Sequence, residues 1–224
     1  MIQKNKPIEL ARKVKLHIER ELPEASDHTL RLAEATPADL DRIMELEQAG
    51  FAAGHQELRA TYALRIATFP QGSLLAWLGD ACVGCVFTEI WHFLPLPPVE
   101  CFTLGHDIRE RHDAVRGTEL YISSMTLAPS VRGMGLGAPL LMGTLSNAVR
   151  SFPGLVSALL LVHAGWKPAR RIYAQAGFAQ LSSFEGFFGP QEDGIVMRRP
   201  LNDLRAIKLV PPVPGQDVRG EIPV

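Results

Sequence analysis

The feature that most constrains the fold is a glycine-rich turn between a strand pattern and a helix pattern. Residues 119–128 read ELYISSMTLA, and such β-branched and aromatic runs are typical of strands. The turn RGMGLG follows at 132–137, and a helix is predicted from there to about residue 151. Glycines adopt positive φ and let backbone amides approach an anion, and the first amides of a helix lack partners. The unit therefore predicts a phosphate-binding turn, with Arg132 as a charged donor.

Known phosphate-binding turns can be compared with this one. A P-loop requires Lys-Ser or Lys-Thr after the glycines, whereas Ala138 and Pro139 follow here. The dinucleotide fingerprint requires G-x-G-x-x-G, whereas the chain has G-x-G-x-G. The third pattern, R-x-x-G-x-G, matches at its fixed positions Arg132, Gly135 and Gly137. On local sequence alone, a plain loop between strand and helix stays open.

The remaining periodicity predicts an α/β fold. Further strands are expected over residues 29–35, 73–78, 81–91, 155–162, 178–188 and 195–201, and further helices over residues 36–49, 55–68 and 167–176. The chain divides into an N-terminal amphipathic helix extension (residues 1–28), one domain (residues 29–200) and an extended C-terminal tail (residues 201–224). Residues 92–118 lack periodicity, and a long irregular segment in a compact domain is often functional.

Composition and charge exclude several classes of protein. The 23 Lys and Arg residues against 24 Asp and Glu give a net charge of −1, which provides no basic field for nucleic acid. The longest apolar run, residues 155–162, is too short for a membrane span, and the N-terminus lacks a secretory signal. Cys82 and Cys85 lie three residues apart in one strand, which predicts opposite faces and neither a disulfide nor a metal site. We expect a cytoplasmic protein without a metal.

A second motif, downstream of the R-x-x-G-x-G turn, makes the assignment of that turn to one family specific. Residues 168–178 read PARRIYAQAGF, which resembles the A-x-x-x-Y-x-x-x-G-F helix of the GNAT superfamily of acyl-CoA-dependent N-acyltransferases. The R-x-x-G-x-G turn resembles the pyrophosphate-binding motif of the same superfamily. The order of elements over residues 29–200 also fits, so the resemblance covers about three quarters of the chain.

This resemblance implies a mixed, mostly antiparallel sheet flanked by helices, in which two central strands separate and hold the pantetheine arm of acetyl-CoA. The residues implied to bind acetyl-CoA lie on the strand, the turn and the later helix, and they are Met125, Thr126, Leu127, Arg132, Gly133, Met134, Gly135, Leu136, Gly137, Ala138, Trp166, Ala169 and Arg170. Trp166 departs from the family, in which many members have an asparagine that contacts the cofactor.

The resemblance also implies the catalytic groups. Tyr173 matches the tyrosine that protonates the departing thiolate. Tyr121 and Ser123 stand where the arylalkylamine branch has histidines that act as base, so that base is missing. Strand alternation predicts that Glu119 shares a face with both, at a spacing of about 6.6 Å, and Glu119 is therefore the best candidate for the base. An exposed acid at the start of a strand is the alternative.

Three stretches, at residues 62–70, 104–106 and 112–129, resemble the arylalkylamine N-acetyltransferases. They imply acetyl transfer to the primary amine of a small molecule by direct attack in a ternary complex. Acylation of a protein N-terminus or lysine, and a non-catalytic acyl-CoA-binding module, are the alternatives. The predicted partner is a small amine with an apolar or aromatic body, with no nucleic acid and no membrane, and a homodimer stays open. Residues that could also contact the acceptor are Glu89, Trp91, His106, His112 and His163.

Overall fold

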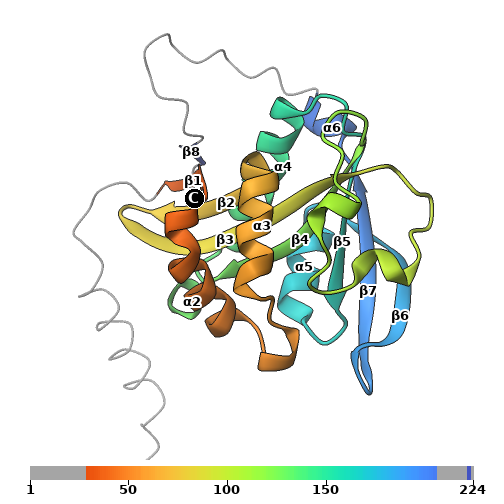
Figure 1. The fold of residues 1–224 in the computed structure, drawn as a ribbon, viewed down its shortest axis with the longest axis horizontal. Helices are drawn as coiled ribbons and strands as arrows, with labels where there is room; N and C mark the ends of the chain where they lie inside the picture. Colours follow the sequence, from red (N-terminus) through yellow and green to blue (C-terminus); the bar gives the residue numbers. More distant parts are fainter. Residues whose placement is uncertain (1–28, 206–220, 223–224) are drawn as a thin grey trace, which may run out of the picture.

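The computed structural model describes residues 29–205 and 221–222. They form one sheet between two layers of helices (Figure 1). The strands are ordered β6-β7-β5-β4-β3-β2-β1-β8. All neighbours are antiparallel except β4 and β5, which are parallel. The predicted mixed, mostly antiparallel α/β sheet is therefore confirmed.

The elements have the following bounds. The strands are β1 (Leu30–Glu34), β2 (Ser73–Leu78), β3 (Ala81–Trp91), β4 (Glu119–Leu127), β5 (Ser157–His163), β6 (Ala179–Gly189), β7 (Glu192–Pro200) and β8 (Glu221–Ile222). The α-helices are α2 (Leu40–Gly50), α3 (Arg59–Thr68), α4 (Gly137–Ser151), α5 (Lys167–Gln175) and α6 (Asn202–Arg205). Short 3-10 turns include Ala53–His55, Val99–Phe102, Ile108–Glu110 and Pro129–Val131.

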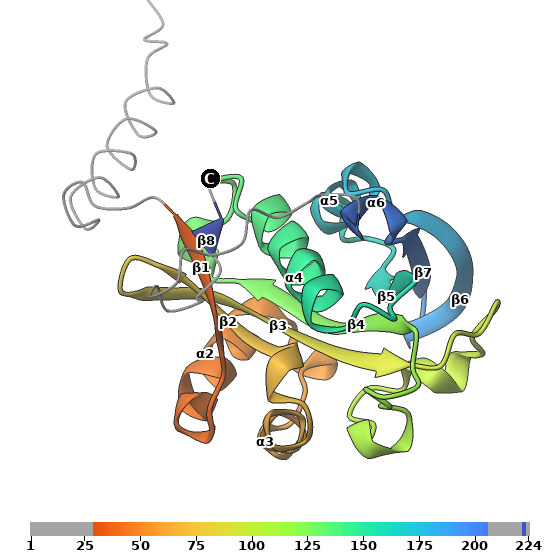
Figure 2. The same cartoon turned by 90° about the horizontal axis from the view of Figure 1, so that it is seen from above.

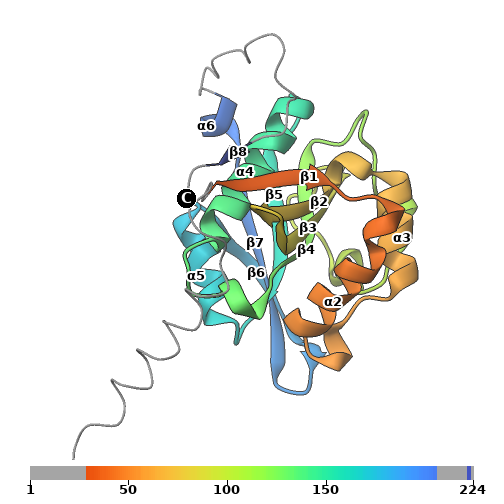
Figure 3. The ribbon, with the colours of Figure 1, turned by 90° about the vertical axis from the view of Figure 1, so that its left-hand side faces the viewer.

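Each face of the sheet has its own core. Helices α2 and α3 cover one face, and α4 and α5 cover the other (Figures 2 and 3). Cys85 and Phe87 of β3 pack with Ile43 and Tyr62 on the α2–α3 side. The alternate residues of β3, such as Val86, belong to the core beneath α4 and α5. Side chains of β3 thus pack beneath both layers of helices, because successive side chains along a strand point to opposite faces.

Strands β4 and β5 separate along their length. Their pairing runs only from Glu119 with Ser157 to Ile122 with Leu160. Both strands continue beyond these pairs, to Leu127 and His163 respectively. Beyond the pairing, the edge of β4 that faces β5 has backbone groups without a strand partner, and such groups require another hydrogen-bonding partner. The predicted separation of two central strands is present here.

Two β-bulges change the alternation that the sequence predicts. In β4 the register shifts so that Thr88 pairs with Ile122 and Phe87 with Ser124, which leaves Ser123 as the extra residue. The Tyr62 hydroxyl from the α2–α3 side lies 3.4 Å from Ser124, so simple alternation from Tyr121 does not continue through the bulge. The Ser123 hydroxyl donates to the Phe87 carbonyl of β3.

A second bulge, in β3, corrects the prediction for the cysteines. Gly84 pairs with Ala76 and Cys82 with Trp77, which leaves Val83 as the extra residue. Cys82 and Cys85 therefore both pack against the core beneath α2 and α3, not on opposite faces. Both are free thiols.

Other boundaries differ from the predictions for local reasons. Helix α4 begins only at Gly137, because residues 133 and 135 have positive φ and cannot be helical. The predicted extended tail is wrong in part, since Leu201 is fully buried, α6 follows it, and β8 pairs with β1. The predicted N-terminal helix lies outside the described residues. Within the described part of the chain, no helix is long and apolar enough to cross a membrane.

Candidate active site

A cavity of about 470 Å³ lies where β4 and β5 separate. Its walls come from both strands, from α2 and the connection to α3, from the β3–β4 connection, from the start of α4, from α5 and from β6. The lining includes most of the predicted site residues, namely Tyr121, Met125, Thr126, Leu127, Arg132, Gly137, Trp166, Ala169 and Tyr173. Glu119 and Arg170 do not line it.

The glycine-rich turn is open. Gly133 and Gly135 have φ of +82° and +84°, and a Cβ built on either would meet no atom of residues 29–205 or 221–222 within 4 Å. Arg132, which precedes them, donates from Nε to the Leu127 carbonyl (3.1 Å) and from Nη2 to the Ala49 carbonyl (3.3 Å). The first amides of α4 face the same region and lack intrahelical partners. An anionic group fits this turn, because the backbone there is accessible and the helix N-terminus favours negative charge.

Of two further residues that were predicted to contact the acyl donor, Trp166 lines the cavity and Arg170 does not. Trp166 lines the cavity and stacks on His163, with ring centroids 5.3 Å apart. Arg170 donates from Nη1 to the Ala164 carbonyl at 3.0 Å, and its Nε is buried without a partner among the described residues. The guanidinium of Arg170 therefore stabilises the loop between β5 and α5.

Tyr173 lines the cavity, and its helix, α5, lies on the face of the sheet opposite α2 and α3 (Figure 2). The residue is buried, and burial raises the pKa of its phenol to about 12. The structure records no hydrogen bond for its hydroxyl among the described residues. The phenol therefore stays protonated at neutral pH and is free to donate.

Glu119 is fixed by other side chains. Its Oε1 accepts from Arg198 Nε of β7 and from the Ser157 hydroxyl of β5, both at 2.7 Å. Arg198 also donates to the carbonyls of Leu94 and Pro95, so it ties the β3–β4 connection to the sheet. The Glu119 side chain is 1% exposed. The structure thus places Glu119 in a buried ion pair and outside the cavity.

Tyr121 lines the cavity and stacks on Trp91, with ring centroids 3.9 Å apart. Burial raises the pKa of the Tyr121 phenol, and the nearby Glu89 raises it further. A neutral phenol with a raised pKa is a poor base. Tyr121 is therefore better placed to shape the cavity than to accept a proton.

Two carboxylates that the sequence analysis missed line the cavity. Glu47 of α2 accepts the Glu57 amide at Oε1 (2.8 Å) and the Tyr62 hydroxyl at Oε2 (2.7 Å). Burial raises the pKa of Glu47 above its ordinary value of 4.5, although these hydrogen bonds oppose the shift. Glu57 pairs with Arg65 at 3.0 Å, and its Oε2 has no partner among the described residues. The helical spacing of Glu47 predicts a partly buried position, but only the tertiary fold places it opposite β4.

The histidines take different positions. His55, from the Ala53–His55 turn, lines the cavity and lies 3.0 Å from the Phe188 carbonyl of β6 and 3.4 Å from Glu192. His163 lies against Trp166 and 3.9 Å from the same Glu192. These contacts join the α2–α3 connection to the β6–β7 hairpin across the cavity. Among the described residues, no group of three or more His, Cys, Asp or Glu side chains could hold a metal ion.

Comparison with known proteins assigns the family. The model of the acetyltransferase (GNAT) family matches residues 40–178. The chain belongs to the GNAT acetyltransferase family. It is accordingly an acyl-CoA-dependent N-acyltransferase, as the sequence predicts.

Solved structures share the fold. The GNAT-like decarboxylase GphF in complex with isobutyryl-CoA has a TM-score of 0.63 and 20% identity, over 76% of this chain and 99% of that one. The ribosomal-protein-S18-alanine N-acetyltransferase of Escherichia coli has a TM-score of 0.56 and 17% identity, over 77% and 94%. Naa50 of Arabidopsis thaliana, in complex with a bisubstrate analogue, has a TM-score of 0.56 and 18% identity, over 76% and 97%. No curated protein sequence matches. These neighbours differ in their substrates, so the fold does not determine the acceptor.

Proposed function

We propose that this GNAT enzyme transfers an acetyl group from acetyl-CoA to the primary amine of a small molecule with an apolar or aromatic body. The observation that carries the proposal is one cavity lined by a buried carboxylate, Glu47, and a buried phenol, Tyr173. The first suits a general base and the second a general acid. They come from helices on opposite faces of the sheet, and the open edge of β4 runs between them.

The donor would bind along β4 and the turn that follows it. The backbone edge at residues 123–127 offers hydrogen bonds to the amides of the pantetheine arm. The turn at residues 132–138 offers backbone amides to the phosphates. The predicted donor residues Met125, Thr126, Leu127, Arg132 and Gly137 already line the cavity. Gly133, Met134, Gly135, Leu136 and Ala138 belong to the same turn and the first residues of α4.

The charges near the acceptor end favour a cation. Three buried carboxylates, Glu47, Glu57 and Glu89, lie beside one arginine, Arg65, and one histidine, His106. With both bases protonated, one negative charge is left over. A buried uncompensated charge is costly, and an alkylammonium ion would neutralise it. An amine acceptor therefore fits better than a neutral or anionic one.

The shape of the cavity supports a small acceptor. Phe102, Leu104 and Tyr121 give the cavity apolar and aromatic walls. The contacts of His55 with Phe188 and Glu192 join the α2–α3 connection to the β6–β7 hairpin, and we infer that this bridge hinders an extended peptide. These features agree with the resemblance to the arylalkylamine branch, and they favour that branch over acylation of a protein N-terminus or lysine.

The reaction needs a base and an acid. An alkylamine has a pKa of about 10, so its ammonium must lose a proton before the nitrogen can attack the thioester. Glu47 accepts that first proton, directly or through one water molecule, and later releases it to solvent. The C–N bond forms, the C–S bond breaks, Tyr173 protonates the departing thiolate, and the second proton that the nitrogen loses on becoming an amide restores the Tyr173 phenol through water. We move the role of base from Glu119 to Glu47, because Arg198 and Ser157 already occupy the carboxylate of Glu119.

An acceptor screen tests the proposal. The protein is incubated with acetyl-CoA and a panel of arylalkylamines, polyamines and basic peptides, and release of free thiol is followed. We expect arylalkylamines to give the highest kcat/KM. Faster turnover of basic peptides would favour the protein acetyltransferase alternative. Binding of acetyl-CoA without any turnover would favour the non-catalytic module.

A further inference from the structure

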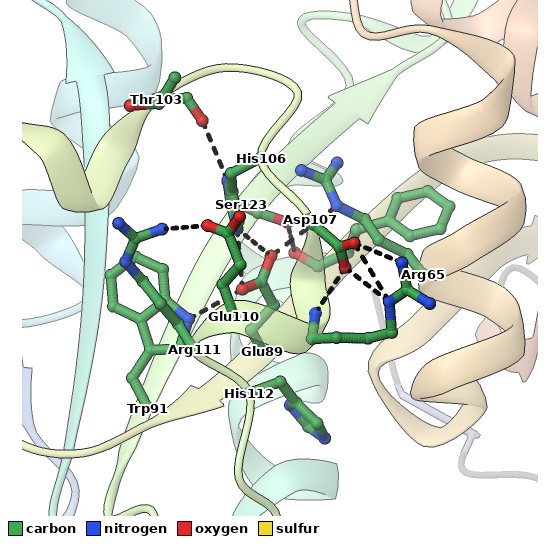
Figure 4. Close-up of polar contacts among 12 residues, drawn as sticks. Arg65, Glu89, Trp91, Thr103, His106, Asp107, Glu110, Arg111, His112 and Ser123 are labelled. Atoms are coloured by element: carbon green, nitrogen blue, oxygen red, sulfur yellow. Dashed lines mark hydrogen bonds and ion pairs between the residues drawn. The ribbon is translucent and has the colours of Figure 1, made fainter.

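The fully buried carboxylate of Glu89 in β3 contacts Trp91 of the same strand, His106 of the β3–β4 connection and Arg65 of α3 (Figure 4). Its two oxygens accept from His106 Nε2 at 2.9 Å, and its Oε2 accepts from Trp91 Nε1 at 2.8 Å. Arg65 Nε of α3 lies 3.8 Å from its Oε1. Glu89 does not line the cavity, so any effect it has on the acceptor acts through these neighbours.

The contact between Glu89 and His106 holds the β3–β4 connection. His106 Nδ1 lies 3.0 Å from the Thr103 carbonyl, while its Nε2 faces the Glu89 carboxylate. Both partners are acceptors, so both ring nitrogens donate and the ring is an imidazolium. The short turn from Thr103 to His106 is thereby fixed on β3. Phe102 and Leu104, on either side of Thr103, line the cavity.

The other two contacts of Glu89 involve Trp91 and Arg65. Trp91, which donates to Glu89, stacks on Tyr121 of β4. Arg65 pairs with Glu57, whose backbone amide donates to Glu47. The positions of Tyr121 and Glu57, both lining residues, therefore depend on groups that contact the same buried carboxylate.

We propose that Glu89 and His106 form a positioning pair that sets the affinity for the apolar body of the acceptor by holding Phe102 and Leu104 against it. Neither residue takes part in proton transfer. The proposal rests on the proposed function, since it assumes an amine acceptor in this end of the cavity. When a contact stabilises the ground state and the transition state equally, its loss raises KM and leaves kcat unchanged.

The test compares two amines in the variant His106→Gln. 2-Phenylethylamine has an apolar body, whereas methylamine has none. We expect the KM for 2-phenylethylamine to rise about tenfold, as for the loss of one charge-assisted hydrogen bond, with kcat within twofold. The kcat/KM for methylamine should not fall, because loss of the imidazolium leaves more negative charge for its ammonium group, and the Kd for acetyl-CoA should be unchanged. Glu89→Gln should raise the KM for 2-phenylethylamine more than the KM for methylamine, and His106→Gln covers the case in which that buried substitution fails to fold.

A matched control comes from the same connection. His92 forms an exposed pair with Asp113 at 3.2 Å, away from the cavity lining, so His92→Gln should leave the KM for 2-phenylethylamine unchanged. An equal loss of kcat/KM for both amines in His106→Gln, or no change for either, would overturn the proposal. Calorimetry of 2-phenylethylamine binding to the protein–CoA complex repeats the comparison without turnover, and wild-type protein that binds no amine there would also overturn it. Amine binding with no acetyl transfer would contradict the proposed function alone.

Discussion

At the scale of single residues, two buried carboxylates differ in what surrounds them. Glu119 and Glu47 are each 1% exposed. Arg198 pairs with Glu119, whereas Glu47 accepts hydrogen bonds from a tyrosine and a backbone amide and lines the cavity. Arg198 and Ser157 thus occupy the Glu119 carboxylate, which does not line the cavity. Burial instead raises the pKa of Glu47, which makes it a stronger base.

The first prediction concerns the pH dependence of Glu47. The base must be a carboxylate to accept a proton, so kcat/KM should rise with pH through its pKa. Because burial raises that pKa, the rise should lie above the ordinary value of 4.5. Glu47→Gln should abolish this acidic limb and lower kcat by roughly 10²–10⁴-fold. The measurement is the pH–rate profile of amine acetylation.

Glu119→Gln is the matched control for this prediction, since it also removes a buried carboxylate. It should keep the acidic limb. Loss of the limb in Glu119→Gln, with the limb retained in Glu47→Gln, would return the role of base to Glu119.

The second prediction concerns Tyr173 as general acid. Tyr173→Phe removes only the hydroxyl, for which the structure records no hydrogen bond among the described residues. We expect kcat to fall by roughly 10²–10⁴-fold while the Kd for acetyl-CoA stays the same. Thiol-release assays measure kcat, and calorimetry measures the Kd for acetyl-CoA. Thermal unfolding checks that the fold is intact. Full activity of the variant would exclude Tyr173 as the acid.

At the scale of elements, the turn before α4 depends on backbone conformation more than on space. Gly135 has φ of +84°, a region that β-branched side chains rarely adopt. A Cβ there would meet no atom of the described residues within 4 Å, so the open space is available for a ligand. The sequence motif therefore specifies both a conformation and an approach path.

The third prediction follows from this geometry. Gly135→Val should weaken acetyl-CoA binding, because the side chain enters the open space and the backbone conformation becomes strained. Gly79→Val is the matched control, since Gly79 also has positive φ and open surroundings, but lies in the β2–β3 turn. Both should lower the melting temperature, and only Gly135→Val should raise the Kd measured by calorimetry. Equal affinities for the two variants would contradict a phosphate-binding role for the turn.

The fourth prediction concerns the ion pair that ties β4 to β7. Arg198→Met leaves the Glu119 carboxylate buried without its partner and frees the carbonyls of Leu94 and Pro95. Loss of one partner of a buried pair typically costs about 3–5 kcal/mol of the free energy of unfolding. Arg116→Met, which breaks an exposed pair with Asp113, should change stability little. Urea unfolding curves measure both, and similar stabilities for the two variants would contradict the structural role of Glu119.

At the scale of the whole molecule, the sequence predicted the local elements well. Strands β1 to β7, the helices α4 and α5 and the glycine-rich turn between β4 and α4 each have a local signal, either periodicity or glycines at fixed spacing. Strand alternation from Tyr121 points along β4 to Glu119 as the base. Glu47, which we propose instead, lines the cavity from α2, and such a contact between distant segments has no periodic signal. The bulges at Val83 and Ser123 also escaped prediction, because strand pairing alone decides where an extra residue fits.

The last prediction concerns the order of the reaction in the complete cavity. The proposed donor groove along β4 and the proposed acceptor end beside Glu47 belong to one continuous cavity, so we expect both substrates to bind together. No cysteine lines that cavity within the described residues, and Cys85 and Cys101 are buried elsewhere. Direct attack by the amine therefore requires a ternary complex, and initial rates at varied concentrations of both substrates should give intersecting double-reciprocal lines. Parallel lines, or protein that gains the mass of one acetyl group when incubated with acetyl-CoA alone, would instead indicate an acyl-enzyme intermediate.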